Sequence, residues 1–222
     1  MQVKMEESTE PVKIKLPYSE LIVGITGCGK TYYLLKRLEK ILEGNPTLQH
    51  IFIICPTLKH NRSYKEWKLV KKYINKIKFI GCHQNGVDKE IEKIIKNDSL
   101  AGTDQNLKTL VVLDDCAMGK DVKNRASELV SLSYAGRHQG IGIITITQYL
   151  TAVARAYRSG VTRLITFYTE SKKDVVVLMD EFLSRANKNE REEIQNKLYN
   201  SRYGYLVVEK VYPRCRYLVL PK

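Results

Sequence analysis

One eight-residue segment near the N-terminus constrains the fold more than any other feature of the sequence. Residues 24–31 read Gly-Ile-Thr-Gly-Cys-Gly-Lys-Thr, which fits the pattern G-x-x-x-x-G-K-[ST] at every fixed position. The apolar run 20–23 precedes this segment, and residues 30–43 follow it with apolar side chains at a helical spacing. A strand, a glycine-rich turn and a helix in this order are the context that a phosphate-binding loop requires.

Each part of the segment has a physical role in such a loop. Small residues allow successive backbone N–H groups to converge on phosphate oxygens, and the N-terminus of the following helix adds positive potential. Lys30 is expected to neutralise the β- and γ-phosphates of a nucleotide, and the Thr31 hydroxyl to bind Mg²⁺. The expected phosphate-binding residues are Gly24, Ile25, Thr26, Gly27, Cys28, Gly29, Lys30 and Thr31.

Apolar runs and amphipathic segments alternate along the rest of the chain. The runs predict strands at residues 50–55, 78–82, 109–113, 141–147 and 162–168. Helical spacing predicts helices at residues 63–77, 87–96, 122–135, 151–158, 172–184 and 188–199. This alternation predicts an α/β fold with a mostly parallel central sheet flanked by helices. Residues 204–211 and 215–220 predict a C-terminal β-hairpin at an edge of that sheet. We expect a flexible arm at residues 1–16 and a single domain at residues 17–222.

The charge of the chain restricts the choice of partner. The 222 residues include 37 Lys and Arg and 24 Asp and Glu, which gives a net charge of +13. This excess favours a polyanion, nucleic acid ahead of an anionic membrane surface, although a merely basic soluble enzyme is the alternative. No run approaches the roughly 18 apolar residues of a membrane-spanning helix. The N-terminus lacks the apolar core of a secretory signal, so we expect no membrane-spanning segment and no secretion.

Two acidic residues, Asp114 and Asp115, follow directly after the apolar run 109–113. Ligands of an α/β sheet bind at the carboxyl ends of its strands, so both acids should face the same crevice as residues 24–31. Asp114 suits the role of an Mg²⁺ ligand, directly or through water, and Asp115 that of polarising an attacking water. The alternative is a solvated turn, because Asp is common in turns.

The predicted strand 141–147 is followed by Gln148. If this strand lies between the strand of the phosphate loop and the acidic strand, Gln148 can sense the γ-phosphate or position the water. The alternative is a glutamine that only bonds to a neighbouring loop.

Taken together, three segments resemble the FtsK–HerA superfamily of DNA-pumping ATPases. They are residues 24–31, the Asp-Asp strand end and the sequence GRHQGIGIITITQ at residues 136–148. The resemblance is closest to the viral genome-packaging branch, the poxvirus-type ATPases of large DNA viruses, virophages and related elements. It covers roughly residues 18–150 at the level of motifs and rests on element order beyond them. The resemblance implies a RecA-like P-loop core, Mg-dependent ATP hydrolysis, a homo-oligomeric ring and translocation of double-stranded DNA into a preformed capsid.

The resemblance also implies roles for individual residues. Lys30 and Thr31 match the phosphate and magnesium positions, Asp114 matches the metal acid, Asp115 the catalytic acid and Gln148 the sensor. Much of the wider superfamily has Glu where Asp115 stands, whereas the packaging branch often shows the Asp pair. Capsid or portal-vertex proteins are the implied partners, and the virion or the host-cell cytoplasm, including virus factories, is the implied location.

Ring ATPases commonly insert an arginine from a neighbouring subunit at the γ-phosphate. Arg137 is the first candidate because it lies in the segment that matches the family best and precedes a strand, away from the phosphate site of its own subunit. Arg155, Arg158 and Arg163 are further candidates, and a surface arginine is the alternative for each.

The segment 59–78 carries eight Lys or Arg residues and one acid. As a helix, residues 63–77 would place Tyr64 and Trp67 on an apolar stripe in the core. They would place a lysine stripe outside, where it could follow DNA phosphates without reading sequence. The lysines of this stripe are Lys65, Lys68, Lys72 and Lys76, and a solvated helix face is the alternative.

Two other functions remain open at this point. A P-loop nucleoside or nucleotide kinase would use an arginine-rich lid, for which residues 150–163 offer three arginines. Such a kinase does not require a strand that ends in Asp-Asp. A non-catalytic DNA-binding or assembly subunit is the third possibility, against which the intact Lys30, Thr31 and Asp114 argue.

Overall fold

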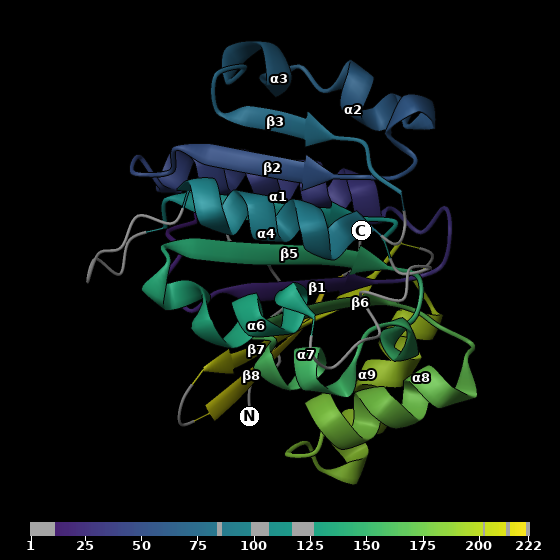
Figure 1. The fold of residues 1–222 in the computed structure, drawn as a ribbon. Helices are drawn as coiled ribbons and strands as arrows, with labels where there is room; N and C mark the ends of the chain where they lie inside the picture. Colours follow the sequence, from purple (N-terminus) through teal and green to yellow (C-terminus); the bar gives the residue numbers. More distant parts are fainter. Residues whose placement is uncertain are drawn as a thin grey trace.

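Eight strands form one sheet in the computed structural model, which describes residues 12–83, 86–98, 107–116, 127–201, 203–211 and 214–220. The order of the strands is β3-β2-β4-β5-β1-β6-β7-β8 (Figure 1). All pairings from β3 to β6 are parallel, whereas β7 is antiparallel to both β6 and β8. The predicted α/β fold, with a mostly parallel sheet and a C-terminal hairpin at its edge, is confirmed.

The elements follow the predicted alternation. The strands are β1 (Ser19–Val23), β2 (His50–Ile54), β3 (Ile77–Ile80), β4 (Thr109–Asp114), β5 (Ile141–Thr147), β6 (Arg163–Phe167), β7 (Tyr205–Val211) and β8 (Arg214–Leu220). The α-helices are α1 (Lys30–Gly44), α2 (Arg62–Glu66), α3 (Leu69–Lys72), α4 (Val87–Asp98), α6 (Glu128–Ala135), α7 (Arg155–Gly160), α8 (Lys172–Val177) and α9 (Lys188–Tyr199). A π-helical stretch, Leu178–Phe182, continues α8. Most of the predicted loop 97–108 and residues 122–126 of a predicted helix lie outside the described residues.

Helices cover both faces of the sheet, with α1 behind it and α4, α6 and α7 in front of it in Figure 1. The central strands β1, β4 and β5 are buried along their whole length. Leu21 and Val23 of β1 pack on the side of α4 and α6, whereas Ile22 packs on the side of α1. Burial on both faces explains why these strands read as continuous apolar runs rather than alternating ones.

Residues 12–16, the described part of the predicted flexible arm, pack along α1. The backbone N–H of Val12 donates to the Lys40 carbonyl at 3.0 Å, and that of Ile14 donates to Oδ1 of Asn45 at 2.9 Å. Ile14 and Leu16 are buried in the core on the α1 side of the sheet. Their two apolar side chains, spaced two residues apart, are covered by the domain, so the packed region begins before residue 17. Residues 1–11 lie outside the described residues.

The prediction of one helix over residues 63–77 is wrong. The chain forms the short helices α2 and α3 instead, and the backbone is extended at Trp67 between them. The indole N–H of Trp67 donates to Oε1 of Glu39 on α1 at 3.3 Å. Burying this large ring against a helix from another part of the chain outweighs the continuation of the helix. Tyr64 and Trp67 are in the core as predicted. Ile74, which a continuous helix over residues 63–77 would place on the same apolar stripe, is 65% exposed.

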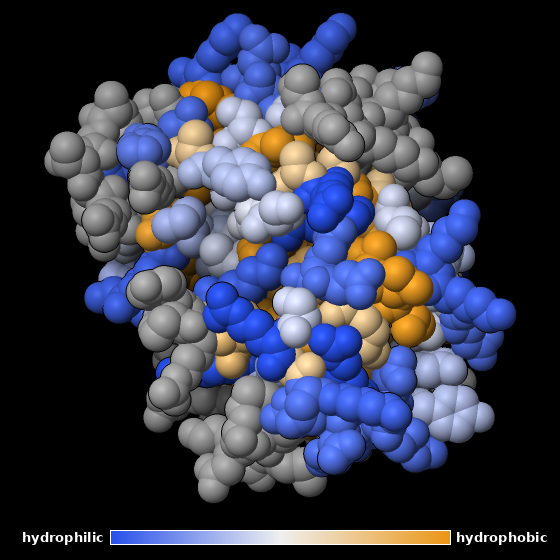
Figure 2. Space-filling view, turned by 90° about the horizontal axis from the view of Figure 1, so that it is seen from below, coloured by the Kyte–Doolittle hydropathy of each residue, from blue (hydrophilic) through white to orange (hydrophobic). Residues whose placement is uncertain are grey.

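Figure 2 shows the surface from below the view of Figure 1, at the end where β8 and α9 lie. Apolar side chains of the described residues lie there in small patches between polar ones. Separate apolar patches of this kind are ordinary on a folded protein surface and do not by themselves indicate a partner.

Candidate nucleotide-binding site

Residues 24–31 connect the carboxyl end of β1 to the first turn of α1. Gly27 and Gly29 have φ angles of 83° and 102°, a region that side chains with a Cβ rarely adopt. These two residues turn the chain so that α1 begins at Lys30 and its N-terminal N–H groups lie at the loop. The Nζ of Lys30 donates to the Ile25 carbonyl at 2.7 Å, and therefore the ammonium group lies over the loop itself. Thr31 follows it in the first turn of α1.

The sheet brings the acidic pair and Gln148 to the same edge as this loop. Strand β5 lies between β1 and β4, which is the position that the predicted role of Gln148 as γ-phosphate sensor or water-positioning residue requires. Thr147 pairs with Val23, the last residue before the loop, and the neighbouring Ile146 pairs with Asp114. Gln148 follows Thr147 and is exposed at that edge.

Asp114 is only 3% exposed at the end of β4. Burial raises the pKa of its carboxyl group to about 6, and the neighbouring charge of Asp115 also raises it. The Tyr64 hydroxyl donates to Oδ2 at 2.7 Å and lowers the pKa, as does the charge of Lys30. The influence of Lys30 means that the phosphate loop and this acid share one electrostatic environment.

Asp115 directly follows β4 and has a φ of 56°, in the left-handed region that Asp and Asn tolerate better than most residues. Its Oδ2 accepts a hydrogen bond from the Thr57 hydroxyl at 3.3 Å. The backbone turn therefore places this carboxylate beside the segment that follows β2. This turn supports a fixed position for Asp115 rather than a freely solvated one.

Three residues at the site were missed from the sequence, namely Thr57, Asn61 and the hydroxyl of Tyr64. Thr57 and Asn61 lie in the connection between β2 and α2, and Tyr64 lies in α2 itself. Asn61 Nδ2 donates to Oδ2 of Asp114 at 3.5 Å. Their place in the sequence was the available signal, because they follow β2. Strand β2 pairs with β4 in parallel, so polar residues after β2 reach the same sheet edge as the acids after β4.

The side chains of the two predicted metal ligands, Thr31 and Asp114, can coordinate a metal ion only through oxygen atoms. The Thr31 hydroxyl and the Asp114 carboxylate are hard ligands of the kind that Mg²⁺ takes, with phosphate oxygens and water completing its octahedron. The burial of Asp114 leaves an acid that is ionised at neutral pH yet poorly hydrated, which favours a cation as its neighbour. The residues therefore fit Mg²⁺.

Two of the arginine candidates are held inside their own subunit. Arg158 makes a bidentate pair with Glu181 at 2.8 and 2.9 Å, and Arg163 bonds to Glu209. Both guanidinium groups are buried, so the expectation that either reaches a neighbouring subunit is wrong. Arg155 has a side chain that is 77% exposed. Arg137 lies in the 3-10 turn before β5, and its side chain lies outside the described part of the structure.

The four candidate DNA-binding lysines do not form one stripe. The Nζ of Lys65 donates to the Lys59 carbonyl at 3.0 Å, and that of Lys76 donates to the Leu48 carbonyl at 2.6 Å. Lys72 lies over the ring of Tyr73, and Lys68 is exposed between α2 and α3. The expected continuous stripe is wrong because the helix that would align it is broken at Trp67.

The sequence matches the family described as Poxvirus A32 protein over residues 10–213. This chain belongs to that family. The match confirms the resemblance to the poxvirus-type branch of the FtsK–HerA superfamily that three motifs indicated. No curated protein matches the sequence.

Solved structures share the fold of this A32-family chain. B204, the DNA-packaging ATPase from Sulfolobus turreted icosahedral virus, gives a TM-score of 0.66 at 16% identity, covering 92% of this chain and 98% of B204. The genome packaging NTPase B204 from Sulfolobus turreted icosahedral virus 2, in complex with ATP-gammaS, gives 0.66 at 16% identity, with 90% and 96% covered. The pCW3 conjugation coupling protein TcpA with ATPgS gives 0.54 at 13% identity, with 94% and 60% covered.

One negative finding concerns the helices of this A32-family chain. Among the described residues, none of them combines the length and the apolar character needed to cross a membrane.

Proposed function

We propose that this A32-family protein is an Mg-dependent ATPase that drives double-stranded DNA into a preformed viral capsid. The observation that carries the proposal is the meeting of the phosphate loop with Asp114 and Asp115 at one sheet edge, where the charge of Lys30 acts on Asp114. A nucleotide whose phosphates lie on the loop would have its γ-phosphate end directed toward these acids.

The side chains have separate tasks in this proposal. Thr31 and Asp114 would hold Mg²⁺, which supplies positive charge to the β- and γ-phosphate oxygens when it is bound. Lys30 and the N–H groups at the start of α1 bind the same oxygens. Asp115 orients the attacking water and accepts its proton, and Gln148 at the end of β5 positions the water or the γ-phosphate. Thr57 holds the Asp115 carboxylate in place.

The DNA part of the proposal rests on family, charge and relatives. B204 is described as a DNA-packaging ATPase, and this chain shares its fold over nearly its full length. A net charge of +13 suits a polyanionic substrate. Capsid or portal-vertex proteins would then be the partners, and the virion or the virus factory the location.

The kinase alternative loses the feature that supported it. Of the three arginines in residues 150–163, Arg158 and Arg163 are buried in ion pairs within the domain and do not form a mobile lid. A non-catalytic DNA-binding subunit would have no use for the Lys30–Asp114 arrangement. The motor is therefore the better supported function.

One experiment tests the proposal directly. ATP turnover is measured with and without double-stranded DNA, alongside the native mass of the protein. We expect Mg-dependent turnover that DNA stimulates, together with the mass of an oligomer. Phosphate transfer to a nucleoside without any effect of DNA would support the kinase instead, and nucleotide binding without turnover would support the non-catalytic subunit.

The ring itself is tested by mixing two inactive variants. Arg137→Ala and Lys30→Ala subunits should together exceed the turnover of either variant alone. The reason is that some interfaces regain an intact loop from one subunit and an intact arginine from the other. Rescue should be partial, because random mixing also forms doubly defective interfaces. If subunits exchange without rescue and Arg137→Ala alone is fully active, the trans arginine is another residue, and Arg155 is the next to test.

A further inference from the structure

The turn that follows β5 carries Gln148 and begins directly beside the phosphate loop. Gly24, the first residue of that loop, donates its backbone N–H to the Thr147 carbonyl at 3.2 Å. The Thr147 hydroxyl donates to the Tyr149 carbonyl at 3.3 Å, which closes a tight turn around Gln148. The place of Gln148 relative to a phosphate on the loop therefore depends on how firmly this turn is held.

A buried carboxylate from α8 holds the next part of the turn, the 3-10 stretch Leu150–Ala152. Oδ1 of Asp174 accepts hydrogen bonds from the backbone N–H of Thr151 at 3.0 Å and from the Thr151 hydroxyl at 2.9 Å. Asp174 has no exposed surface, so water does not compete for these two bonds. The two bonds tie the turn behind Gln148 to a helix that follows the next strand, β6.

A buried guanidinium group from α7 supports the same turn. Nη1 of Arg158 donates to the carbonyls of Leu150 at 3.2 Å and Val153 at 2.6 Å. The bidentate pair with Glu181 fixes the orientation of this group and links it to the π-helical stretch that continues α8. Any substitution of Arg158 leaves a partly buried carboxylate unpaired, so Asp174 is the residue through which the support of the turn can be tested more cleanly.

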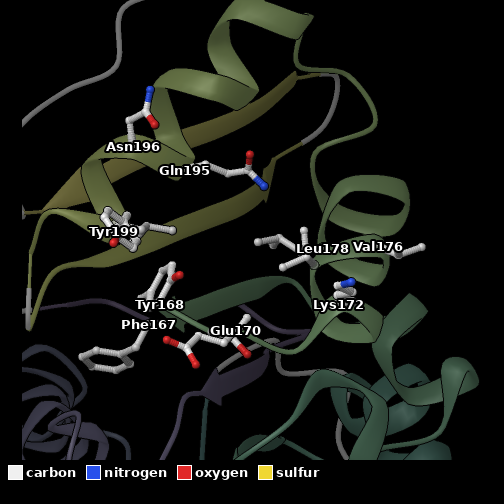
Figure 3. A pocket seen from close by; sticks show the side chains of 12 residues that line it. Phe167, Tyr168, Glu170, Lys172, Val176, Leu178, Gln195, Asn196 and Tyr199 are labelled. Atoms are coloured by element: carbon white, nitrogen blue, oxygen red, sulfur yellow. The ribbon is translucent and has the colours of Figure 1, made fainter.

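The cavity shown in Figure 3 borders α8 but is separate from these contacts. It has a volume of about 690 Å³ and lies between the end of β6 and the helices α8 and α9. Val176 lines it from α8 and is 57% exposed, whereas Asp174 does not line it. Helix α8 thus offers one side chain that holds the turn and another that a substitution can change without touching the turn.

We propose that Asp174 is a positioning residue for Gln148, because it anchors the turn on which Gln148 approaches the γ-phosphate. This inference rests on the proposed ATPase function and on the role of Gln148 in it. Both bonds from Thr151 end on one oxygen of Asp174, and Oδ2 is buried with no hydrogen-bond partner among the described residues. An amide that keeps the accepting oxygen should therefore hold the turn in the same place.

Asp174→Ala and Gln148→Ala, made singly and together, test whether one residue acts through the other. ATP turnover gives kcat, and competition against mant-ATP fluorescence gives the affinity for ATP. Gln148→Ala should lower kcat by roughly 10²-fold. Asp174→Ala should lower kcat by about tenfold, because Gln148 is displaced while Arg158 still holds part of the turn, and should change ATP affinity by no more than about twofold. The double variant should be no slower than Gln148→Ala alone, since nothing is left to position.

Further variants separate the anchor from the rest of α8. Asp174→Asn should have the kcat of the original protein, as should Val176→Ala and the charge-matched Asp180→Ala, whose side chain is exposed. Thr151→Ala removes only a hydroxyl from an exposed residue and should lower kcat by about threefold. This variant, combined with Gln148→Ala in the same way, decides the question if Asp174→Ala does not fold.

Several outcomes would overturn the positioning role. Multiplicative losses in the double variants would mean that Asp174 acts independently of Gln148, and equal losses of kcat and ATP affinity would mean that it only supports the fold. Unchanged kcat in folded Asp174→Ala and Thr151→Ala, or normal turnover in Gln148→Ala, would also contradict it. Absence of ATP hydrolysis in the original protein contradicts the proposed function itself, whereas hydrolysis with multiplicative losses contradicts only the role of Asp174.

Discussion

The phosphate loop and the segment 59–78 both stood out in the sequence, yet only the loop has the structure that its pattern predicts. The loop is built from local rules, since glycines with positive φ and a helix start at Lys30 fix its shape. The segment has a helical period, but Trp67 contacts Glu39 and Tyr64 contacts Asp114, far away in the chain. The difference teaches that a period alone does not predict a helix whose large side chains have partners elsewhere.

The two regions nevertheless serve one site. The loop contributes the cation Lys30, and the segment 59–78 contributes the Tyr64 hydroxyl and the Asn61 amide, which both donate to Asp114. The following predictions weigh the contribution of each region, from the largest expected effect to the smallest.

Lys30→Ala should lower ATP turnover by about 10³-fold while leaving the fold intact. The variant removes the positive charge at the β- and γ-phosphates, which no other residue of the loop supplies. Turnover and circular dichroism measure the two effects. Lys93→Ala, on the exposed face of α4, is the matched control and should be fully active. Normal turnover in a folded Lys30→Ala protein would contradict both the motor hypothesis and the kinase hypothesis.

Asp115→Asn should lower hydrolysis by roughly 10²–10³-fold and preserve binding of Mg-ATP. The amide keeps the shape and can still accept the bond from Thr57, but it lacks the charge that polarises water. Single-turnover hydrolysis and nucleotide binding separate the two effects, with the exposed Asp180→Asn as control. If Asp115→Asn hydrolyses ATP normally and Asp114→Asn loses only nucleotide affinity, the catalytic acid has been assigned to the wrong residue.

Tyr64→Phe tests what the broken segment contributes to the site. Burial holds the pKa of Asp114 at about 6, and the bond from the Tyr64 hydroxyl lowers that pKa. Removing the hydroxyl should raise the pKa further, so the acid limb of kcat/KM for Mg-ATP should move up by about one pH unit. The direction follows because Asp114 binds Mg²⁺ only when ionised. The control Tyr73→Phe should leave the acid limb of kcat/KM unchanged. If Tyr64→Phe also leaves this limb unchanged, the ionisation of Asp114 does not govern it.

The lysines of the segment should have the smallest effect. Changing Lys65, Lys68, Lys72 and Lys76 to Gln should reduce the magnitude of the slope of log DNA affinity against log salt concentration by about two. Each phosphate contact contributes about 0.9, and two of the lysines are engaged with backbone carbonyls. Changing Lys89, Lys93, Lys96 and Lys188 to Gln gives the same loss of charge as a control. An unchanged slope would place the DNA surface elsewhere in the ring.

The sequence by itself determined the frame of this protein. The loop 24–31, the continuous apolar strands and the acids at the end of β4 follow from local chemistry and from the rule that parallel strands present ligands at their carboxyl ends. These features depend on neighbours in sequence, or on a topology that few connections permit, so a single chain is enough to predict them.

Only the tertiary structure decided what surrounds that frame. It buried Asp114 beside Tyr64, 50 residues away, and paired Arg158 with Glu181, 23 residues away. It also assembled a cavity of about 480 Å³ from α1, the end of β6 and the start of β7, with Tyr32, Phe167 and Tyr205 among the lining residues. Charged and aromatic side chains suit a surface, an ion pair or a cavity equally well in a sequence. The choice among them is made by desolvation and by partners that only the packed chain brings within reach.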